Sequence, residues 1–319
     1  MVMNHYIAEE QKDINSPYKL AHISDLHLST LDHVNWRQLL NKRVLGYLSW
    51  YGNRRRIHRL DVLEDVLADI ANIQSDHLII SGDLTHIGTP QEYDQVAGWL
   101  ASHGSPEQIS LVPGNHDCYV KENSQHTTSL WAPFMQGDAQ NQDESEPVFP
   151  SFRQRGPVAI IGMSSAVPTA PFFATGKLGN QQIEQMKELL EKAREMGLFR
   201  IVVLHHGPLA SSNSFRKRLV DAETFRTALS SAGAELVLHG HGHYPVTDWL
   251  NINGVDVPVV GAPSASQLSS SNSKRAGYNT YEVQRHERGW TLKITSRKYE
   301  NPPGELRDID YKEIELPAR

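Results

Sequence analysis

The 319-residue chain contains one cysteine, Cys118, and this scarcity excludes two kinds of structure. A single thiol cannot build an internal disulfide framework, and it cannot supply the thiolates of an all-cysteine structural zinc site. Such a composition fits the reducing interior of a cell. We therefore predict a cytoplasmic location.

Long hydrophobic runs are also missing. No apolar stretch approaches the ~18–20 residues that are needed to span a bilayer. Residues 1–20 carry Glu, Asp and Lys and lack an apolar core, so we predict no signal peptide. The formal net charge of −6 argues against nucleic acid as a dedicated partner.

Two patterns divide the chain. Over residues 18–245, strand-like apolar runs alternate with amphipathic stretches such as 58–73, where apolar residues recur at helical spacing. This alternation predicts an α/β sheet. Residues 246–319 read as strands and turns without helices, which predicts a second, mostly antiparallel sheet packed face to face on the first. We predict one domain over 1–319, with an insertion at 35–59.

Polar side chains gather where five of the predicted strands end. They are Asp25, His27, Asp83, Asn115, His116, Asp117, His205, His206, His241 and His243. Loops at the carboxyl ends of strands in an α/β sheet converge on one crevice. We therefore expect these sequence-distant segments to bring potential metal ligands to the same edge.

The spacing of the ligands supports a shared site. Asp25 and His27 form an i, i+2 pair, as do His241 and His243, and in extended backbone such residues point to the same side. The set mixes carboxylate, imidazole and amide groups. Seven candidate ligands are too many for one tetrahedral ion and suit two ions ~3.5–4 Å apart with a bridging carboxylate. This chemistry leaves Mn, Fe, Zn and Co open.

The ordered set D-x-H, G-D, G-N-H-D, H and G-H-x-H resembles the calcineurin-like metallophosphoesterase superfamily. These motifs span residues 25–243. The resemblance implies a four-layer α/β/β/α sandwich of two packed mixed sheets. It also implies a hydrolase that cleaves phosphodiester bonds of a small molecule through a dinuclear metal centre and a metal-bridging hydroxide.

The resemblance further implies roles for the metal ligands. Asp83 is the expected bridge between the two ions. The expected ligands of the first metal are Asp25, His27 and His243, and those of the second are Asn115, His205 and His241. The family pattern places the ligand directly after V-x-x of the strand, which selects His205. His206 is then expected outside the ligand set or facing the substrate.

Three more residues receive roles in the same way. His116 resembles the family's catalytic histidine that binds no metal and lies near the leaving-group oxygen, and Asp117 is expected to orient it. Purple acid phosphatases carry a ligating tyrosine three positions after the bridging aspartate, where this chain has His86. The resemblance therefore points to the bacterial branch with cyclic-nucleotide and glycerophosphodiester phosphodiesterases. His86 is expected in the wall of the pocket or beside the ligands.

Several alternatives stay open at this point. The same metals can serve a phosphomonoesterase or a hydrolase of nucleotide or lipid pyrophosphates. A metal-free interaction scaffold is disfavoured because every expected ligand is present. The basic and aromatic insertion, with its cations at 42–59, reads as a helical segment packed over the sandwich, an anion-attracting rim, a surface for anionic lipid head groups or an oligomer contact.

Overall fold

Two six-stranded mixed sheets form the centre of the computed structural model, which describes residues 16–121, 124–139, 148–210, 214–300 and 304–317. Residues 1–15, on which the prediction of no signal peptide largely rests, lie outside this range. None of the helices in the described part of the chain is long and apolar enough to cross a membrane.

The first sheet contains both N-terminal and C-terminal strands. They are β1 (Tyr18–Ile23), β2 (His77–Ile80), β3 (Ile109–Leu111), β10 (Gly277–His286), β11 (Gly289–Tyr299) and β12 (Leu306–Pro317), in the order β12-β11-β10-β1-β2-β3. β1, β2 and β3 are parallel, whereas β10 runs antiparallel to β1.

The second sheet is built from the middle of the chain. Its strands are β4 (Ser151–Arg155), β5 (Val158–Gly162), β6 (Phe199–Val203), β7 (Leu236–His239), β8 (Val246–Ile252) and β9 (Val255–Gly261), in the order β4-β5-β6-β7-β9-β8. The four central strands are parallel, and antiparallel strands close both edges.

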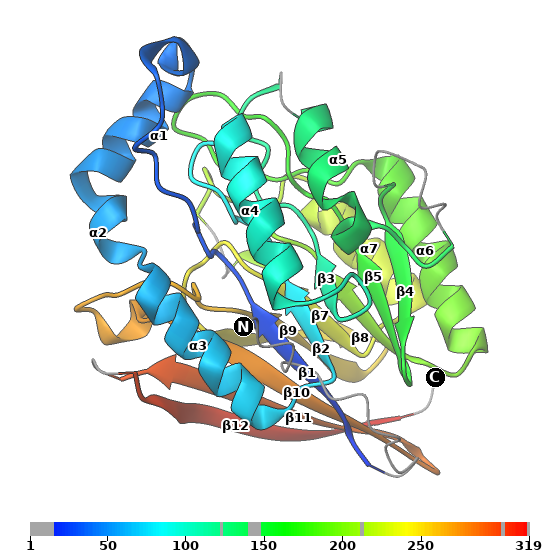
Figure 1. Cartoon of the computed structure of the whole chain (residues 1–319). Coiled ribbons are helices and arrows are strands. Elements are labelled where there is room, and N and C mark those ends of the chain that lie inside the picture. The colour runs from blue at the N-terminus through cyan, green and yellow to red at the C-terminus, as the bar shows by residue number, and fades with distance from the viewer. Residues whose placement is uncertain (1–15, 122–123, 140–147, 211–213, 301–303, 318–319) are drawn as a thin grey trace.

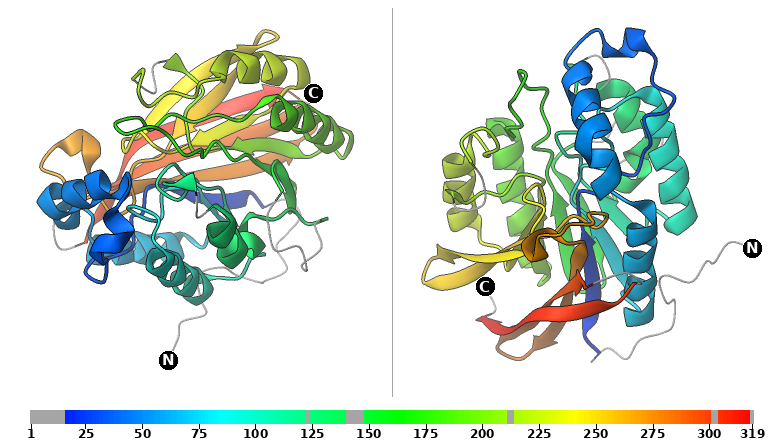
Figure 2. Two further views of the ribbon diagram at one scale, coloured as in Figure 1. Left: turned by 90° about the horizontal axis from the view of Figure 1, so that it is seen from above. Right: turned by 90° about the vertical axis from the view of Figure 1, so that its left-hand side faces the viewer.

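Helices cover the outer faces of both sheets (Figures 1 and 2). They are α3 (Leu60–Ile73), α4 (Pro90–His103) and α5 (Ser124–Met135) on the first sheet, and α6 (Asn180–Glu195) and α7 (Ala222–Ala232) on the second. The predicted insertion contains a 3-10 turn (Trp36–Leu39), α1 (Arg43–Ser49), a π-helical turn (Trp50–Arg54) and α2 (Arg55–Ile57). A further 3-10 turn lies at Asn272–Lys274.

Three apolar cores separate these layers. Leu63 of α3 and Ile80 of β2 belong to the core under the first helical layer. Ile79, the neighbour of Ile80, faces Ile201 in the core between the sheets, because successive strand residues point to opposite faces. Phe225 belongs to the core beneath α6 and α7. The predicted four-layer α/β/β/α sandwich is therefore confirmed.

The prediction for the C-terminal strands is partly wrong. β8 and β9 extend the second sheet, while β10, β11 and β12 extend the first, so the described strands form no separate antiparallel sheet. The reason is that β2 occupies only one edge of β1, and β10 pairs with the other over Tyr18–His22. This pairing joins the C-terminal part 246–319 to the motif-bearing part 18–245, and one domain over 1–319 stays a prediction.

Candidate metal centre

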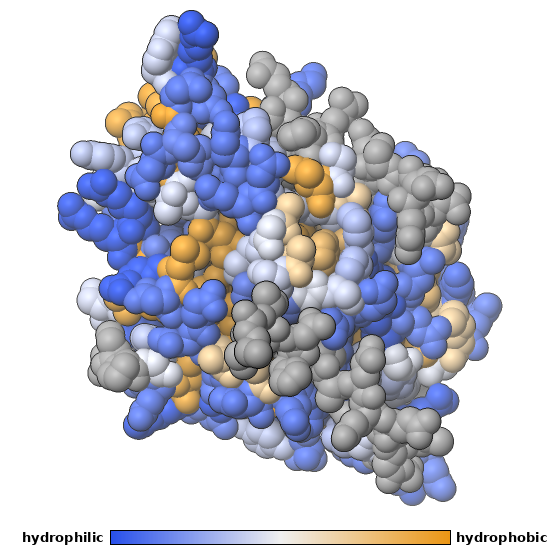
Figure 3. Space-filling model, in the orientation of Figure 1, coloured by the Kyte–Doolittle hydropathy of each residue, from blue (hydrophilic) through white to orange (hydrophobic). Residues whose placement is uncertain are grey.

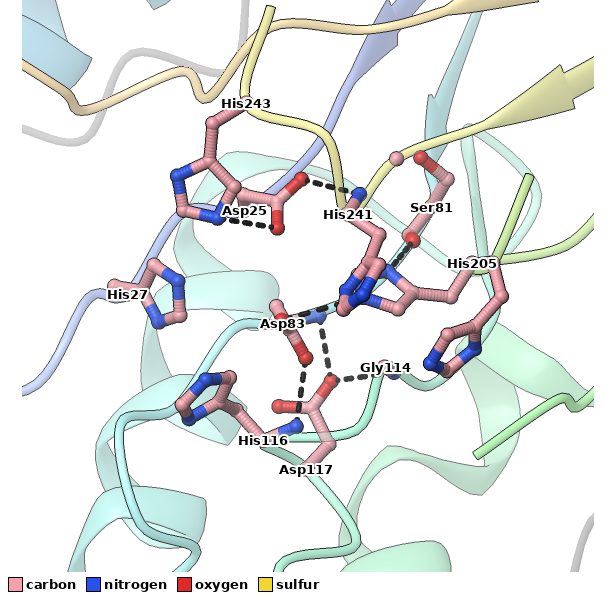
Figure 4. A network of polar contacts seen from close by, with 12 residues as sticks. Asp25, His27, Ser81, Asp83, Gly114, His116, Asp117, His205, His241 and His243 are labelled. Carbon is pink, nitrogen blue, oxygen red and sulfur yellow. Dashed lines mark hydrogen bonds and ion pairs between the residues drawn. The ribbon is translucent and has the colours of Figure 1, made fainter. Parts of the chain in front are cut away.

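The predicted ligands meet at the carboxyl ends of β1, β2 and β3 in one sheet and of β6 and β7 in the other (Figure 4). Acidic and histidine side chains form four sets here, and within each set the ligand atoms lie within 4.8 Å of one another. The sets are Asp25–His27–His243, Asp25–Asp83–His205, His27–Asp83–His116 and His205–His206–His241. Asp83 and Asp25 each belong to two sets, so the sets adjoin and form one elongated centre.

The backbone of this centre is mostly left-handed. Five of the predicted ligand residues have φ between 46° and 66°: Asp25, His27, Asp83, His241 and His243. The argument from extended i, i+2 geometry is therefore wrong for both pairs. Asp25 and His27 still reach one set, whereas His241 and His243 diverge into different sets. A left-handed non-glycine residue costs about 1–2 kcal/mol, so this conformation is held by the surrounding fold.

Two glycines allow the loops after β2 and β3 to touch. A Cβ on Gly114 would lie 2.2 Å from Asp83 Oδ1, and one on Gly82, whose φ is 98°, would lie 2.5 Å from the Gly114 nitrogen. No side chain fits at either position. The contact also lets the His116 amide donate a 2.7 Å hydrogen bond to Asp83 Oδ1. The two loops thus fix the orientation of the predicted bridging carboxylate.

The donor atoms fit a group of metal ions. Five predicted ligands carry a buried atom without a hydrogen-bond partner: Asp25 Oδ1, His27 Nε2, Asn115 Oδ1, His205 Nε2 and His241 Nε2. Buried polar atoms are normally hydrogen-bonded, since leaving one unpaired costs about 1–3 kcal/mol. Divalent cations satisfy such atoms, and carboxylate, amide and imidazole are suitable donors.

The spacing of two pairs of ligand atoms also fits bound cations. His243 Nε2 lies 3.0 Å from Asp25 Oδ1, and His205 Nε2 lies 3.2 Å from Asp83 Oδ2, both without hydrogen-bond geometry. Neighbouring ligand atoms of one ion have a similar spacing, because metal–ligand bonds of about 2.0–2.2 Å at right angles separate them by about 3 Å. Each pair therefore has the spacing of two ligands of one cation.

Hydrogen bonds at the other ring nitrogen orient the imidazoles. His27 Nδ1 lies 2.7 Å from the Thr85 carbonyl, and His205 Nδ1 lies 2.6 Å from the Ser81 carbonyl. Because a carbonyl only accepts, each Nδ1 carries a hydrogen, so Nε2 is the ring nitrogen that can offer a lone pair to an ion. His243 Nδ1 contacts Gln267 Oε1 at 2.9 Å, so a residue of the C-terminal part also supports the centre.

The electrostatics of the centre favour cations. Burial disfavours the charged forms of Asp25 and Asp83, but neighbouring histidines outweigh it and hold the pKa of both carboxyls below the usual range. Burial also opposes a charge on His205, yet the Asp83 carboxylate raises its pKa to about 9. Two fully buried carboxylates therefore remain negative and attract positive charge, either a proton or a metal ion.

Asp117 does not have the predicted contact. Its carboxylate accepts four backbone hydrogen bonds, from the amides of Asp83, Leu84, Thr85 and Gly114 at 2.9–3.0 Å. Burial and the nearby Asp83 charge raise the pKa of Asp117 to about 7. In this arrangement the carboxylate ties the loop after β2 to the loop after β3, and the orienting role toward the His116 imidazole stays a prediction.

His116 is oriented by two other residues. Its Nδ1 lies 2.5 Å from the His86 carbonyl, and its Nε2 lies 3.0 Å from Arg54 Nη1. The carbonyl can only accept and the guanidinium can only donate, so the imidazole is neutral with its hydrogen on Nδ1. Burial and the Arg54 charge lower the pKa of His116 to about 3. In this arrangement both ring nitrogens of His116 are engaged, and the side chain beside it with N–H groups to donate is Arg54.

His206 and His86 are buried next to the centre. His206 Nδ1 lies 2.8 Å from Ser165 Oγ, while its Nε2 is buried without a partner. The His86 ring stacks on His27 with centroids 5.1 Å apart, and the His86 amide donates to Glu92 Oε1 at 2.6 Å. Both residues contact predicted ligands, so they can position those ligands without touching substrate.

The insertion supplies two site residues that were not predicted. Arg54 contacts His116, and the ring of His58 lies 4.4 Å from that of His27, centroid to centroid. Their spacing of four residues within a helical, strongly basic segment is the signal that could have identified them. Close packing makes this possible, because a Cβ on Gly46 would lie 2.4 Å from the Ile87 side chain.

Known proteins share both the sequence pattern and the fold. Residues 18–245 match the family described as calcineurin-like phosphoesterase. A probable cyclic nucleotide phosphodiesterase from Vesicomyosocius okutanii subsp. Calyptogena okutanii is 24% identical over 271 residues, which cover 83% of this chain and 94% of the relative.

Two solved structures have the same fold. A dimetal phosphatase from Danio rerio matches with a TM-score of 0.54 at 12% identity, covering 93% of this chain and all of that chain (100%). A purple acid phosphatase from yellow lupin matches with a TM-score of 0.58 at 14% identity, covering 92% of this chain and 53% of the lupin chain. At these identities the likeness establishes the fold alone.

The family match covers every predicted ligand, from Asp25 to His243. Six of these seven side chains belong to the sets described above, and five of the seven carry an unpaired donor atom. Sequence, fold and donor chemistry therefore lead to one assignment. This chain is a hydrolytic phosphoesterase and belongs to the calcineurin-like phosphoesterase family.

Proposed function

We propose that the protein hydrolyses phosphodiester bonds of a small-molecule phosphate ester at a dinuclear metal centre. The observation that carries this proposal is the set of five unpaired buried ligand atoms beside a cleft that Asn115 and His116 line. Asp25, His27 and His243 would hold one cation, and Asn115, His205 and His241 the other. Asp83 would lie between them.

Two divalent cations bound there would lower the pKa of water and offset the negative charge of the phosphate. The protein's own contribution is to keep the centre positive. The two charged ligands, Asp25 and Asp83, are fewer than the neutral amide and imidazole ligands. A ligand set made only of carboxylates would cancel the cations' charge and weaken attraction for an anionic ester.

In this proposal Arg54 and His116 act at the leaving group. Both line the cleft next to Asn115, and the Nη1–Nε2 distance of 3.0 Å couples them. Arg54 offers N–H donors to a developing negative oxygen, and His116 holds the guanidinium in place. His116 becomes a proton donor itself only if Arg54 turns toward the phosphate and frees Nε2 to take up a proton.

Relatives named as probable cyclic nucleotide phosphodiesterases support a diester as substrate. A phosphomonoesterase or a pyrophosphate hydrolase is the alternative, because the same metals serve these reactions. The single buried cysteine supports a cytoplasmic location, which stays a prediction.

A substrate panel tests the proposal. Metal-free protein is reconstituted separately with Mn²⁺, Fe²⁺, Zn²⁺ and Co²⁺, and kcat/KM is measured for bis-p-nitrophenyl phosphate, p-nitrophenyl phosphate, cyclic AMP and glycerophosphodiesters. We expect at least one metal to support faster hydrolysis of diesters than of the monoester. Preference for p-nitrophenyl phosphate would favour the monoesterase, and inactivity with every metal would favour a scaffold.

A further inference from the structure

A cleft of about 490 Å³ opens beside Asn115 and His116. The insertion forms one wall with Lys42, Leu45, Gly46, Ser49 and Arg54, and the opposite wall comes from residues 172–174 together with Ser214, Arg216 and Lys217. Lys42 Nζ joins the two walls through a 2.8 Å hydrogen bond to Thr169 Oγ1. The cleft therefore adjoins Asn115, a predicted ligand of the second metal, and is large enough for an organic group.

The cleft has more positive charge than the reacting phosphate needs. Lys42, Arg54, Arg216 and Lys217 line it, and none of its described lining residues is acidic. Arg216 and Lys217 are exposed and lie in the wall opposite the insertion. A monoanionic diester bound at the metal centre would leave these cations without a charged partner among the described residues that line the cleft. Their arrangement fits a ligand with a second negative charge.

Aromatic side chains line the same cleft. Phe172 is 74% exposed and Phe173 is 38% exposed. Phe172 also has a left-handed backbone, with φ of 68°, which is unfavourable for a bulky residue. An exposed phenylalanine kept in this conformation has no role in the core. Strained residues of this kind cluster at ligand-binding sites.

We propose that this cleft binds the leaving-group half of an amphiphilic phosphate ester that carries a second anionic group. The inference rests on the proposed function. Arg216 and Lys217 contact the second anionic group, and Phe172 and Phe173 contact the apolar part of the ligand. An ester with only the reacting phosphate, such as a cyclic nucleotide, leaves Arg216 and Lys217 unused.

Competition between two nucleotides tests the charge. Adenosine 5′-monophosphate and adenosine 3′,5′-bisphosphate, which differ by one phosphate, are compared as inhibitors of bis-p-nitrophenyl phosphate hydrolysis by the metal-loaded protein. We expect the bisphosphate to bind about tenfold more tightly, and the doubly substituted Arg216→Ala/Lys217→Ala protein to lose most of this advantage. The control is Arg288→Ala/Arg307→Ala, which removes two exposed cations, one from the turn between β10 and β11 and one from β12.

The ratio of the two inhibition constants is the readout, so a general loss of activity does not affect it. Equal inhibition by both nucleotides, with diester hydrolysis intact, would overturn the inference and leave the proposed function standing. If the metal-loaded protein hydrolyses no diester, the proposed function fails instead. Titration calorimetry with the same two nucleotides then measures the same ratio without catalysis.

Phe172→Gly separates binding from folding. Glycine accepts a φ of 68° without strain, so the variant should not melt at a lower temperature. We expect a higher KM for a diester with a bulky apolar leaving group and no change for a methyl ester. A lower melting temperature together with unchanged KM values would show that Phe172 is structural.

The outer face of the insertion carries a second, independent inference. Five of its large apolar side chains are between 39% and 73% exposed and recur every three or four residues: Trp36, Leu40, Val44, Leu48 and Tyr51. Trp50 and Gly46 face inward and pack near Ile87 and Tyr119, so the inner contacts leave this outer stripe uncovered. Figure 3 shows hydrophobic and strongly hydrophilic residues side by side where the insertion projects at upper left.

Charge identifies what covers the stripe. Residues 33–60 contain no Asp or Glu, although the whole chain has a net charge of −6. Arg37, Arg55 and Arg56 are exposed beside the stripe. Two copies of such a face would repel each other, whereas an anionic membrane surface complements both the cations and the apolar residues. We infer that the insertion docks on a membrane that contains anionic lipid.

Vesicle sedimentation tests the docking. We expect the full-length protein to sediment with phosphatidylglycerol vesicles, less so at high salt, and not with phosphatidylcholine vesicles. Leu40→Glu/Leu48→Glu should lower the partition coefficient at least about tenfold. Trp249→Glu, at a residue 44% exposed on β8, is the control. Absence of vesicle binding, or a dimer in ultracentrifugation that the double variant abolishes, would overturn the inference.

Discussion

The loops that carry the predicted ligands and the insertion at 35–59 face each other across His116, and they differ in almost every property. The loop residues are buried, strained and held by backbone hydrogen bonds. The insertion is largely exposed and basic, and apolar side chains lie on both of its faces. Buried, rigid loops are suited to positioning ions. An exposed, basic and partly apolar insertion is suited to contacting a larger partner.

This difference suggests a division of labour. The loops are suited to the reaction at phosphorus, which is common to many phosphate esters. The insertion is suited to deciding which ester reaches the centre. Arg54 and His58 are the points where the two regions meet. Substitutions on either side of that contact test whether the two regions have these separate roles.

The largest effect is expected at the predicted bridge. Asp83→Asn removes a charge shared by both cations, so we expect loss of at least one ion per chain and a fall in kcat/KM of about 10⁴-fold or more. Elemental analysis and diester hydrolysis measure the two quantities. Asp94→Asn, on the exposed face of α4, is the control. Two ions retained in the Asp83 variant would contradict the bridging role.

The contact between the two regions comes next. His116→Ala should keep both ions and slow hydrolysis by about 10²–10⁴-fold, more for an alkoxide leaving group than for p-nitrophenolate, which needs little stabilisation. Arg54→Ala should give a deficit of the same kind, because the Arg54 guanidinium supplies the N–H donors to the leaving-group oxygen. Rates with the two leaving groups and metal content are the measurements.

A double-mutant cycle tests whether Arg54 and His116 act as a unit. Because the two side chains contact each other, the double variant should be no slower than the slower single variant. Additive deficits would mean that the insertion and the loop act separately. Undiminished turnover of an alkoxide diester by His116→Ala would contradict the role of His116 altogether.

The sequence identifies candidate ligands that the structure brings close together, but it does not reveal the contacts that hold them. Short local patterns such as D-x-H and G-N-H-D identify side chains whose chemistry is conspicuous, and strand ends place them together. The partners of Asp117 are backbone amides, which every residue has, so no pattern reveals them. The contact between Arg54 and His116 depends on how the insertion folds back over 62 residues of chain. Strand periodicity likewise does not tell which sheet edge β10 joins.

Asp117 should have an intermediate effect of a different kind. Asp117→Asn leaves one acceptor oxygen where four amide N–H groups need two, and it places an N–H₂ group against some of them. We expect metal affinity to fall about 10–100-fold, with activity largely restored by added metal. A deficit that depends on the leaving group and not on metal concentration would instead support the predicted orienting role.

The smallest effect is expected at His206, and it decides between two adjacent histidines. His205 contacts Asp83 and donates from Nδ1 to a carbonyl, so His205→Ala should lose one ion. His206 contacts Ser165, and a Cβ on Gly176 would lie 2.3 Å from its ring, so packing holds it beside His241. His206→Ala should keep both ions and lower kcat/KM about tenfold, because His206 supports a ligand without being one.

His239→Ala, at another buried histidine with an unpaired Nε2, is the matched control for packing. Loss of an ion from the His206 variant, with both retained in the His205 variant, would reverse the choice, since both side chains have an unpaired Nε2 within reach of His241.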